Sequence, residues 1–213
     1  MRAGQRGFSL LEMLLALAIG LALLTAASRV FVSAHEAWRL QGMTTRLQDD
    51  ARLALLRMAQ DIRMAGMFGC LRLEPEDFET PGALAAFAQP LVAGPGRLNL
   101  VVAQLPGMPG EPDWTLLTDC VSYAQVRDGG RQGQDLAVAI SRHRYQLVGT
   151  TLQFRRGTST QPLIDHVREL QVTVVGEGGE QRVDIQLTLF EPTLGIEQHH
   201  ALSVAVRNWR VDA

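Results

Sequence analysis

A single carboxylate stands inside the longest apolar stretch of this sequence, and its position poses the first chemical question. Glu12 is the only charged residue between Phe8 and Ser28. Near the middle of a bilayer, a carboxylate on a helix costs about 2.5 to 3.5 kcal/mol. Such a charge would weaken the apolar core of an ordinary secretory signal sequence. The sequence therefore predicts that a positive charge compensates Glu12.

The rest of the sequence offers no recognisable catalytic or metal-binding arrangement. His199 and His200 are adjacent, so in a strand they point to opposite faces and make a poor metal pair. Asp49 and Asp50 belong to the polar side of a predicted helix, where no cleft encloses them. The sequence has no nucleophile elbow, phosphate-binding loop, dinucleotide-binding motif or zinc-protease helix. We therefore expect a protein that is not an enzyme and that uses no cofactor or metal.

The composition is typical of one globular domain with an extended appendage. The 213 residues are 46% hydrophobic and carry a formal net charge of -2, which excludes wholesale disorder. Because the pI is near 6.2 and no block of basic residues dominates, we expect no nucleic-acid partner. Arg142, Arg144, Arg155 and Arg156 could form a local basic patch, although solvated surface arginines are the simpler interpretation.

The apolar stretch around Glu12 is long enough to cross a membrane. As a helix rising about 1.5 Å per residue, residues 8–28 would cover roughly 30 Å, the thickness of a bilayer core. Arg2 and Arg6 precede the stretch without an acid, so the positive-inside rule places the first residues in the cytoplasm. The simpler alternative is a secretory signal cut within residues 23–30, although this offers only a poor cleavage site.

The sequence RGFSLLEMLLALAIG, residues 6–20, resembles the prepilin motif of type IV pilins and type II secretion pseudopilins. That motif has a glycine at the cut, often a phenylalanine after it, a carboxylate a few residues later, and then an apolar helix. In the family, a membrane aspartyl peptidase cuts after the glycine and methylates the new amino terminus. The resemblance therefore implies a leader at residues 1–7, cleavage between Gly7 and Phe8, and N-methylation of Phe8.

The expected cleavage would supply the cation that Glu12 lacks. The new ammonium of Phe8 would lie in an apolar layer, where an unpaired charge is costly and a paired charge is tolerable. Pairing between neighbouring subunits would also set the axial stagger of the helices, as one buried polar residue fixes register in coiled coils. Pairing within one chain is the competing geometry. A favourable interaction of Glu12 with the helix dipole alone is the simplest alternative.

The helix is predicted to continue well beyond the membrane. The sequence has no proline before Pro75, and the first strong stop is Gly66. One helix is therefore expected over residues 8–65, with Gly42 as its weak point.

The two halves of this helix are predicted to have different environments. Residues 8–35 would form the transmembrane or filament-core half, and residues 36–66 an amphipathic half. Polar residues such as Arg57 and Asp61 are assigned to the solvent side of the second half. A core stripe at helical spacing comprises Leu47, Ala51, Ala54, Leu55, Met58, Ile62 and Ala65.

Residues 67–115 are rich in proline and glycine and are predicted to be irregular. Seven of the nine prolines fall between Glu74 and Asp113. Cys70 and Cys120 bracket the region. On the oxidising side of the membrane, two thiols are expected to form one disulfide, and two buried free cysteines are the alternative.

Residues 116–213 are predicted to form an antiparallel β headgroup. Several β-rich runs alternate in polarity and are separated by glycine-rich segments. The segment 173–190, TVVGEGGEQRVDIQLTLF, predicts a hairpin, because glycines adopt the positive φ values of a tight reversal. The last strands are expected to pack on the amphipathic helix half. The predicted fold class is therefore α+β and type IV pilin-like.

Further segments resemble minor pilins of the PilW type and, more loosely, J-type pseudopilins. They are LQDDARLALLRMAQDIRMAG at 47–66, MFGC at 67–70 and LIDHVRELQVTVV at 163–175. The resemblance implies a minor pilin that initiates, primes or caps type IV pilus assembly, in support of twitching motility, adhesion or DNA uptake. The implied partners are other minor pilins, the major pilin, the prepilin peptidase, the assembly platform with its ATPase, and a large tip adhesin.

The implied location is the inner membrane, crossed once, with a periplasmic headgroup, and later the base or tip of a pilus. A J-like minor pseudopilin of a type II secretion system is the nearest alternative function. A signal-anchored periplasmic binding protein is the alternative from another class.

Overall fold

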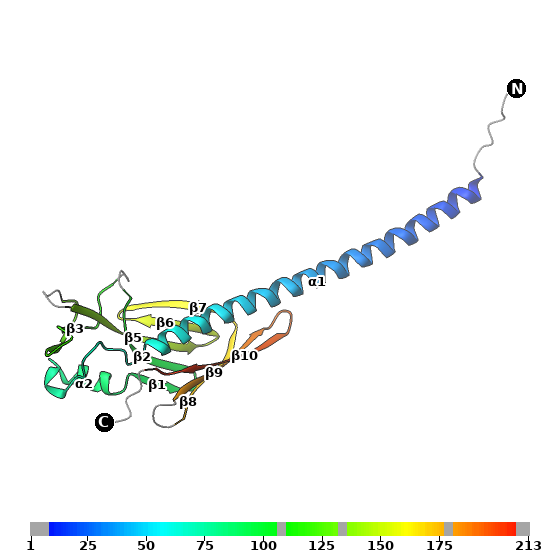
Figure 1. Ribbon diagram of the computed structural model, residues 1–213. Helices are drawn as coiled ribbons and strands as arrows, with labels where there is room; N and C mark the ends of the chain where they lie inside the picture. Colours follow the sequence, from blue (N-terminus) through cyan, green and yellow to red (C-terminus); the bar gives the residue numbers. More distant parts are fainter. Residues whose placement is uncertain (1–8, 106–109, 132–135, 177–180, 208–213) are drawn as a thin grey trace. The chain divides into compact units, whose positions relative to one another are not determined.

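The protein has the expected α+β class, with a long N-terminal helix followed by antiparallel β-sheets (Figure 1). The chain divides into two compact units, Met1–Arg46 and Leu47–Ala213. From here on, headgroup means the part of the second unit that follows residue 66. The structure is a computed structural model and describes residues 9–105, 110–131, 136–176 and 181–207.

Helix α1 extends without a break from Leu10 to Met64, and Gly42 does not interrupt it. The whole predicted core stripe is buried, and Ala59 joins it. Burial begins only at Leu47, later than residue 36, where the amphipathic half was expected to start. The intervening turns carry large exposed apolar side chains such as Trp38, so no single face of them is sheltered.

Ten strands follow within the described ranges, and every pairing among them is antiparallel. Their bounds are β1 Leu91–Gly94, β2 Arg97–Ala103, β3 Trp114–Thr118, β4 Ala124–Asp128, β5 Leu136–Val148, β6 Thr151–Arg156, β7 Ser159–Ile164, β8 Val167–Val175, β9 Arg182–Glu191 and β10 Ile196–Ala205.

The long strand β5 is the centre of a seven-stranded sheet. Its residue Ile140 is opposite both Ala103 of β2 and Trp114 of β3, so these strands lie on opposite edges of β5. Strand β6 pairs with the last part of β5, while β1, β4 and β7 form the outer positions. One strand therefore aligns side chains from most of this sheet.

The last three strands form a separate sheet in the order β10-β9-β8. The predicted hairpin is confirmed, because β8 and β9 pair from Val167–Leu189 to Val175–Arg182. Its tip, residues 177–180, lies outside the described residues. Strand β10 pairs with β9 over its whole length, from Ile196 to Ala205.

The two faces of the larger sheet have different covers, because side chains alternate along β5. His143 and Tyr145 of β5 contact Asp61 of α1. On the opposite face, Ile140 belongs to an apolar cluster that contains Phe87 of α2 (Pro81–Ala88). Through Asp61, α1 thus makes polar contacts with the larger sheet. The packing of the last strands on this half of the helix stays a prediction.

The prediction that residues 67–115 are irregular is wrong. The segment contains the short turn η1 (Pro75–Asp77), helix α2 and strands β1 and β2. Thr80 caps α2, since its hydroxyl oxygen accepts the Ala83 N–H at 3.3 Å, and Pro81 follows it as the first helical residue. Gly96, at φ 68°, lies in the turn from β1 to β2. The prolines and glycines thus mark the ends of short elements.

Candidate functional site

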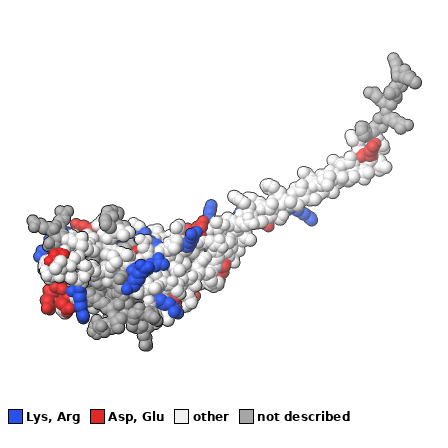
Figure 2. All heavy atoms as spheres, in the orientation of Figure 1, with Lys and Arg blue, Asp and Glu red and all other residues white. Residues whose placement is uncertain are grey.

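The first part of α1, residues 10–46, is not covered by the rest of its own compact unit, and as far as Ser28 it carries apolar side chains on all sides. None of these residues is buried, and Leu10 and Phe31 are 79% and 73% exposed. The helix is long and apolar enough to cross a membrane, with a mean hydropathy of 2.3 in its most apolar window. In Figure 2 the helix has an acidic spot near its start, followed by a long stretch without charged residues. Such a surface requires a cover of lipid or of other apolar helices.

Hydroxyl groups in this part of the helix are satisfied within the helix itself. The side chains of Thr25, Ser28 and Ser33 donate to backbone carbonyls three or four residues earlier, at 2.8 to 3.0 Å. Such bonds remove most of the cost of placing a hydroxyl in an apolar layer. Glu12 is different, because it is the only charged residue between Phe8 and Ser28.

Glu12 lies in the first turn of α1, and its backbone N–H donates to the Ser9 carbonyl at 3.0 Å. Within the described part of the chain its carboxylate has no hydrogen-bond or ion-pair partner. An acid in a first turn interacts favourably with the helix dipole, typically by about 0.3 to 1 kcal/mol. That gain is smaller than the cost of the charge in an apolar layer. Gly7 and Phe8, the predicted cleavage and methylation residues, lie outside the described residues.

A buried polar cluster fastens the second part of α1 to the larger sheet. The Asp61 Oδ2 atom accepts a hydrogen bond from the Tyr145 hydroxyl at 2.5 Å and lies 2.7 Å from His143 Nδ1. Tyr145 and His143 are both buried. Burial, and then the negative charge of Asp61, raise the pKa of Tyr145 well above its ordinary value. The phenol therefore stays protonated and remains a donor to Asp61.

Sequence reasoning missed this cluster, because it assigned Arg57 and Asp61 to the solvent side of the helix. Arg57 instead places its guanidinium 4.1 Å from the centre of the Phe154 ring of β6. His143 packs edge-on against the same ring, with the two centres 5.0 Å apart. The available signal was His143 and Tyr145 at alternating positions of β5, on the face that points toward the helix.

We expect Asp61→Ala to lower the free energy of unfolding by about 2 to 5 kcal/mol, because it leaves two buried polar groups without a partner. Urea unfolding of the full chain in detergent, followed by circular dichroism, measures the change. Asp49→Ala is the matched control, since Asp49 is exposed on the same helix, and it should change stability by less than about 0.5 kcal/mol. Equal effects of the two substitutions would show that the cluster does not hold the helix.

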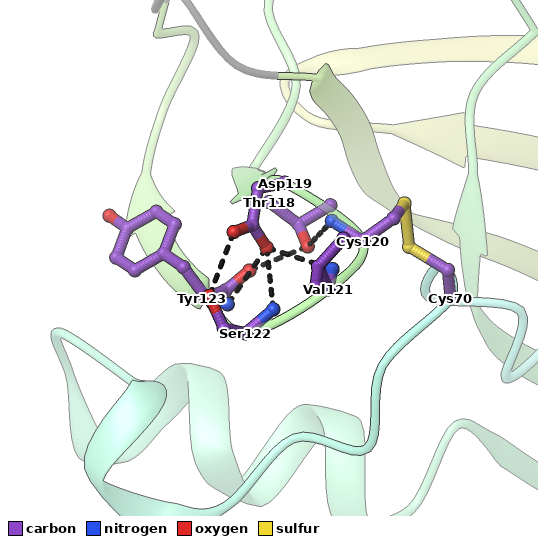
Figure 3. Close-up of a disulfide and its surroundings, with 7 residues drawn as sticks. All are labelled: Cys70, Thr118, Asp119, Cys120, Val121, Ser122 and Tyr123. Carbon is purple, nitrogen blue, oxygen red and sulfur yellow. Dashed lines mark hydrogen bonds between the residues drawn. A yellow bond between two sulfur atoms is a disulfide. The ribbon is translucent and has the colours of Figure 1, made fainter.

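The predicted disulfide between Cys70 and Cys120 is present, with Cα atoms 5.4 Å apart. It joins the segment that follows α1 to the turn between β3 and β4 (Figure 3). Cys120 has a φ of 59°, which is uncommon for a residue other than glycine. Asp119 organises the turn, because its Oδ1 atom accepts the backbone N–H groups of Val121, Ser122 and Tyr123 at 2.8 to 2.9 Å.

The same three N–H groups hold the pKa of Asp119 well below its ordinary range. Because the pKa of Asp119 is lower in the folded chain than in the unfolded chain, its charged form stabilises the fold. This stabilisation is complete when the pH is above the pKa of the unfolded chain, about 3.9, and it is lost as the pH falls through the pKa of the folded chain. We expect Asp119→Asn, which keeps the shape of the acceptor, to make the loss of stability between pH 4 and pH 2 shallower than in the unmodified chain. Chemical unfolding across this range measures the slope, with Asp49→Asn as the control. An unchanged slope would contradict the role of the turn.

The prokaryotic N-terminal methylation motif matches residues 2–28. The N-terminus is of the prepilin type. This signal is that of type IV pilins and pseudopilins, and together with the apolar helix it supports anchoring of this prepilin-like chain in a membrane. No curated protein and no solved structure matches the chain.

The remaining candidate residues of the prepilin-like chain are distributed over both compact units. Glu12 belongs to the first unit, and Cys70 and Cys120 belong to the second. His199 and His200 lie on β10, opposite Thr188 and Leu187 of β9. Among the described residues, no three His, Cys, Asp or Glu side chains come together as a metal site.

Proposed function

We propose that this chain is a minor pilin that takes part in initiating, priming or capping type IV pilus assembly. The observation that carries the proposal is the prepilin-type N-terminus at the start of a helix that is apolar on all sides as far as Ser28. Such a helix suits a bilayer before assembly and the packed helices of a filament after it. The resemblance of residues 47–66 and 163–175 to minor pilins of the PilW type supports the minor role.

Assembly begins with removal of residues 1–7. In this proposal, the prepilin peptidase cuts between Gly7 and Phe8, and Phe8 is methylated. The new ammonium pairs with Glu12 of a neighbouring subunit, which neutralises both charges in the apolar layer and sets the stagger of the helices. Pairing between Phe8 and Glu12 of one chain is the competing geometry.

The prepilin-like chain crosses the inner membrane once in this proposal, with its N-terminus in the cytoplasm and its headgroup in the periplasm. Arg2 and Arg6 before the apolar stretch support that orientation. After assembly the chain lies at the base or tip of the pilus. Its partners are other minor pilins, the major pilin and the assembly platform, with a large tip adhesin at the distal end.

Gene deletion separates this role from that of a J-like minor pseudopilin, which carries the same kind of N-terminus. We expect the deletion strain to lose surface pili and twitching while it secretes exoproteins normally, and a plasmid copy of the gene should restore the pili. Normal piliation with defective exoprotein secretion would assign the chain to a type II secretion system. Normal piliation together with normal secretion would favour a signal-anchored periplasmic binding protein.

A further inference from the structure

A groove on the headgroup places an apolar wall beside arginine side chains. It lies between α2 and the face of the larger sheet that points away from Asp61, and it encloses about 290 Å³. Ala85 and Ala86 of α2 and Val92 of β1 contribute the apolar wall, while Arg142 and Arg144 of β5 contribute the basic side. No carboxylate is among the described residues that line it.

The basic side of the groove continues onto the neighbouring strand. Arg144 is directly opposite Arg155 of β6, and both side chains are exposed. Like charges in this position destabilise a sheet. Among the described residues neither guanidinium pairs with an acid, and the nearest polar contact of Arg155 is a hydrogen bond to the Gly157 carbonyl at 3.1 Å. The pair is therefore a site of uncompensated positive charge.

Arg142 and Arg156 differ from this pair. The Arg142 guanidinium lies 4.5 Å from the centre of the Trp114 ring, and Arg142 borders a second hollow lined by Asp113 and Asp128. Arg156 is opposite His143, so it belongs to the face that contacts α1. The four-arginine patch suggested by the sequence is thus a three-arginine row, and its uncompensated charge is at Arg144 and Arg155.

We propose that this groove docks an acidic segment of a partner protein. Guanidinium groups bind carboxylates with two parallel hydrogen bonds. Arg144 can make them, and so can the two terminal nitrogens of Arg155, since only its Nε–H donates to Gly157. The wall at Ala85 and Val92 would cover an aliphatic side chain next to the carboxylate. A peptide offers both kinds of group, whereas nucleic acid offers a continuous row of phosphates and no aliphatic side chain. The groove is at the small end of ligand pockets, which hold about 300 to 1,000 Å³, so it accommodates a few side chains of an extended segment.

The docking site does not depend on the minor-pilin role, because it lies entirely in the headgroup. The test uses the full chain in a zwitterionic detergent and a fluorescent ten-residue peptide of alternating glutamate and valine. Fluorescence anisotropy should show salt-sensitive binding of this peptide, with at least tenfold weaker binding when glutamine replaces its glutamates.

Two substitutions address the two sides of the groove. Arg144→Gln should weaken binding about tenfold or more, as loss of an arginine anchor does. Ala85→Glu, at an exposed helical position, should weaken it similarly by placing a carboxylate in the groove. Ala88→Glu makes the same change on an exposed residue of α2 outside the groove lining, and Arg182→Gln removes a guanidinium from the other sheet. Both controls should bind within about twofold of the unmodified chain.

Several results would overturn the proposal. One is a failure of the unmodified chain to bind the peptide, and another is an affinity that is unchanged after Arg144→Gln or Ala85→Glu. A third is a loss of affinity in the two control variants as large as the loss that these two substitutions cause. Equally tight binding of an all-glutamate peptide would show that the apolar wall has no role. Tighter binding of a ten-residue oligothymidine that also requires Arg144 would assign the groove to nucleic acid. Circular dichroism of each variant, with retention of the disulfide, verifies that the headgroup is folded.

Discussion

Replacing Glu12 with glutamine should leave the chain cut, methylated and folded but should reduce its incorporation into filaments at least tenfold. Glutamine keeps the size and helix preference of glutamate but removes the charge, so the ammonium of Phe8 would have to enter an apolar layer unpaired. The cost of an uncompensated buried charge is about 3 to 5 kcal/mol, well above the 1.4 kcal/mol that changes an equilibrium tenfold.

The fraction of the chain in sheared surface filaments, against the fraction left in the membrane, measures this effect. Co-purification with the other pilins provides a second readout. Glu36→Gln is the matched control, because it makes the same chemical change at an exposed position of α1 beyond the apolar stretch. Normal incorporation of Glu12→Gln would rule out charge pairing as the basis of assembly, whatever geometry the pair has.

Removing both cysteines should lower the free energy of unfolding of the headgroup by about 4 kcal/mol. The disulfide closes a loop with a sequence separation of 50 residues, and the chain-entropy model gives about this value for such a loop. The closed loop contains η1, α2, β1, β2 and β3. Loss of the disulfide should therefore also loosen the apolar cluster around Phe87.

Urea unfolding of the double variant Cys70→Ser/Cys120→Ser, in detergent, tests this expectation. The unmodified chain treated with a reductant should show the same shift. Ser122→Ala is the control for changes in the same turn, since it removes one hydroxyl contact to Asp119 and keeps the disulfide. A loss below about 1 kcal/mol in the double variant would show that packing alone holds the loop.

The long helix could be predicted from the sequence in detail. Its length follows from the absence of proline before Pro75, and its buried side follows from the spacing of apolar residues from Leu47 to Ala65. Both are local properties of a helix that turns once in 3.6 residues. The disulfide was also predictable, because the sequence contains two cysteines and these can form only one intramolecular pair.

The short elements of the headgroup were missed for a local reason. In the segment around Thr80 and Pro81, the proline was interpreted as part of a loop, although a threonine cap followed by proline also starts a helix. Strand β7 contains Pro162, which by itself argues against a strand, but an outer strand tolerates proline because the N–H groups on its outer edge need not pair. In both cases a proline that is typical of a loop lies within or at the start of a regular element.

The Asp61 cluster and the arginine groove could not be predicted from local patterns. Each depends on which helix packs on which face of β5, and that choice is made by contacts between segments far apart in the chain. Asp61 reaches His143 and Tyr145 across more than 80 residues of sequence. Arg144 meets Arg155 only because β5 turns directly into β6, whereas the wall at Ala85 comes from a helix that precedes both strands.

Mass spectrometry of the mature N-terminus tests the central claim most directly. The chain should be isolated from membranes and from filaments of cells with an intact prepilin peptidase. We expect residues 1–7 to be missing and the first peptide to begin at Phe8, heavier by one methyl group. An intact leader, or a chain that begins near Ala27, would contradict the assembly role proposed for Phe8 and Glu12.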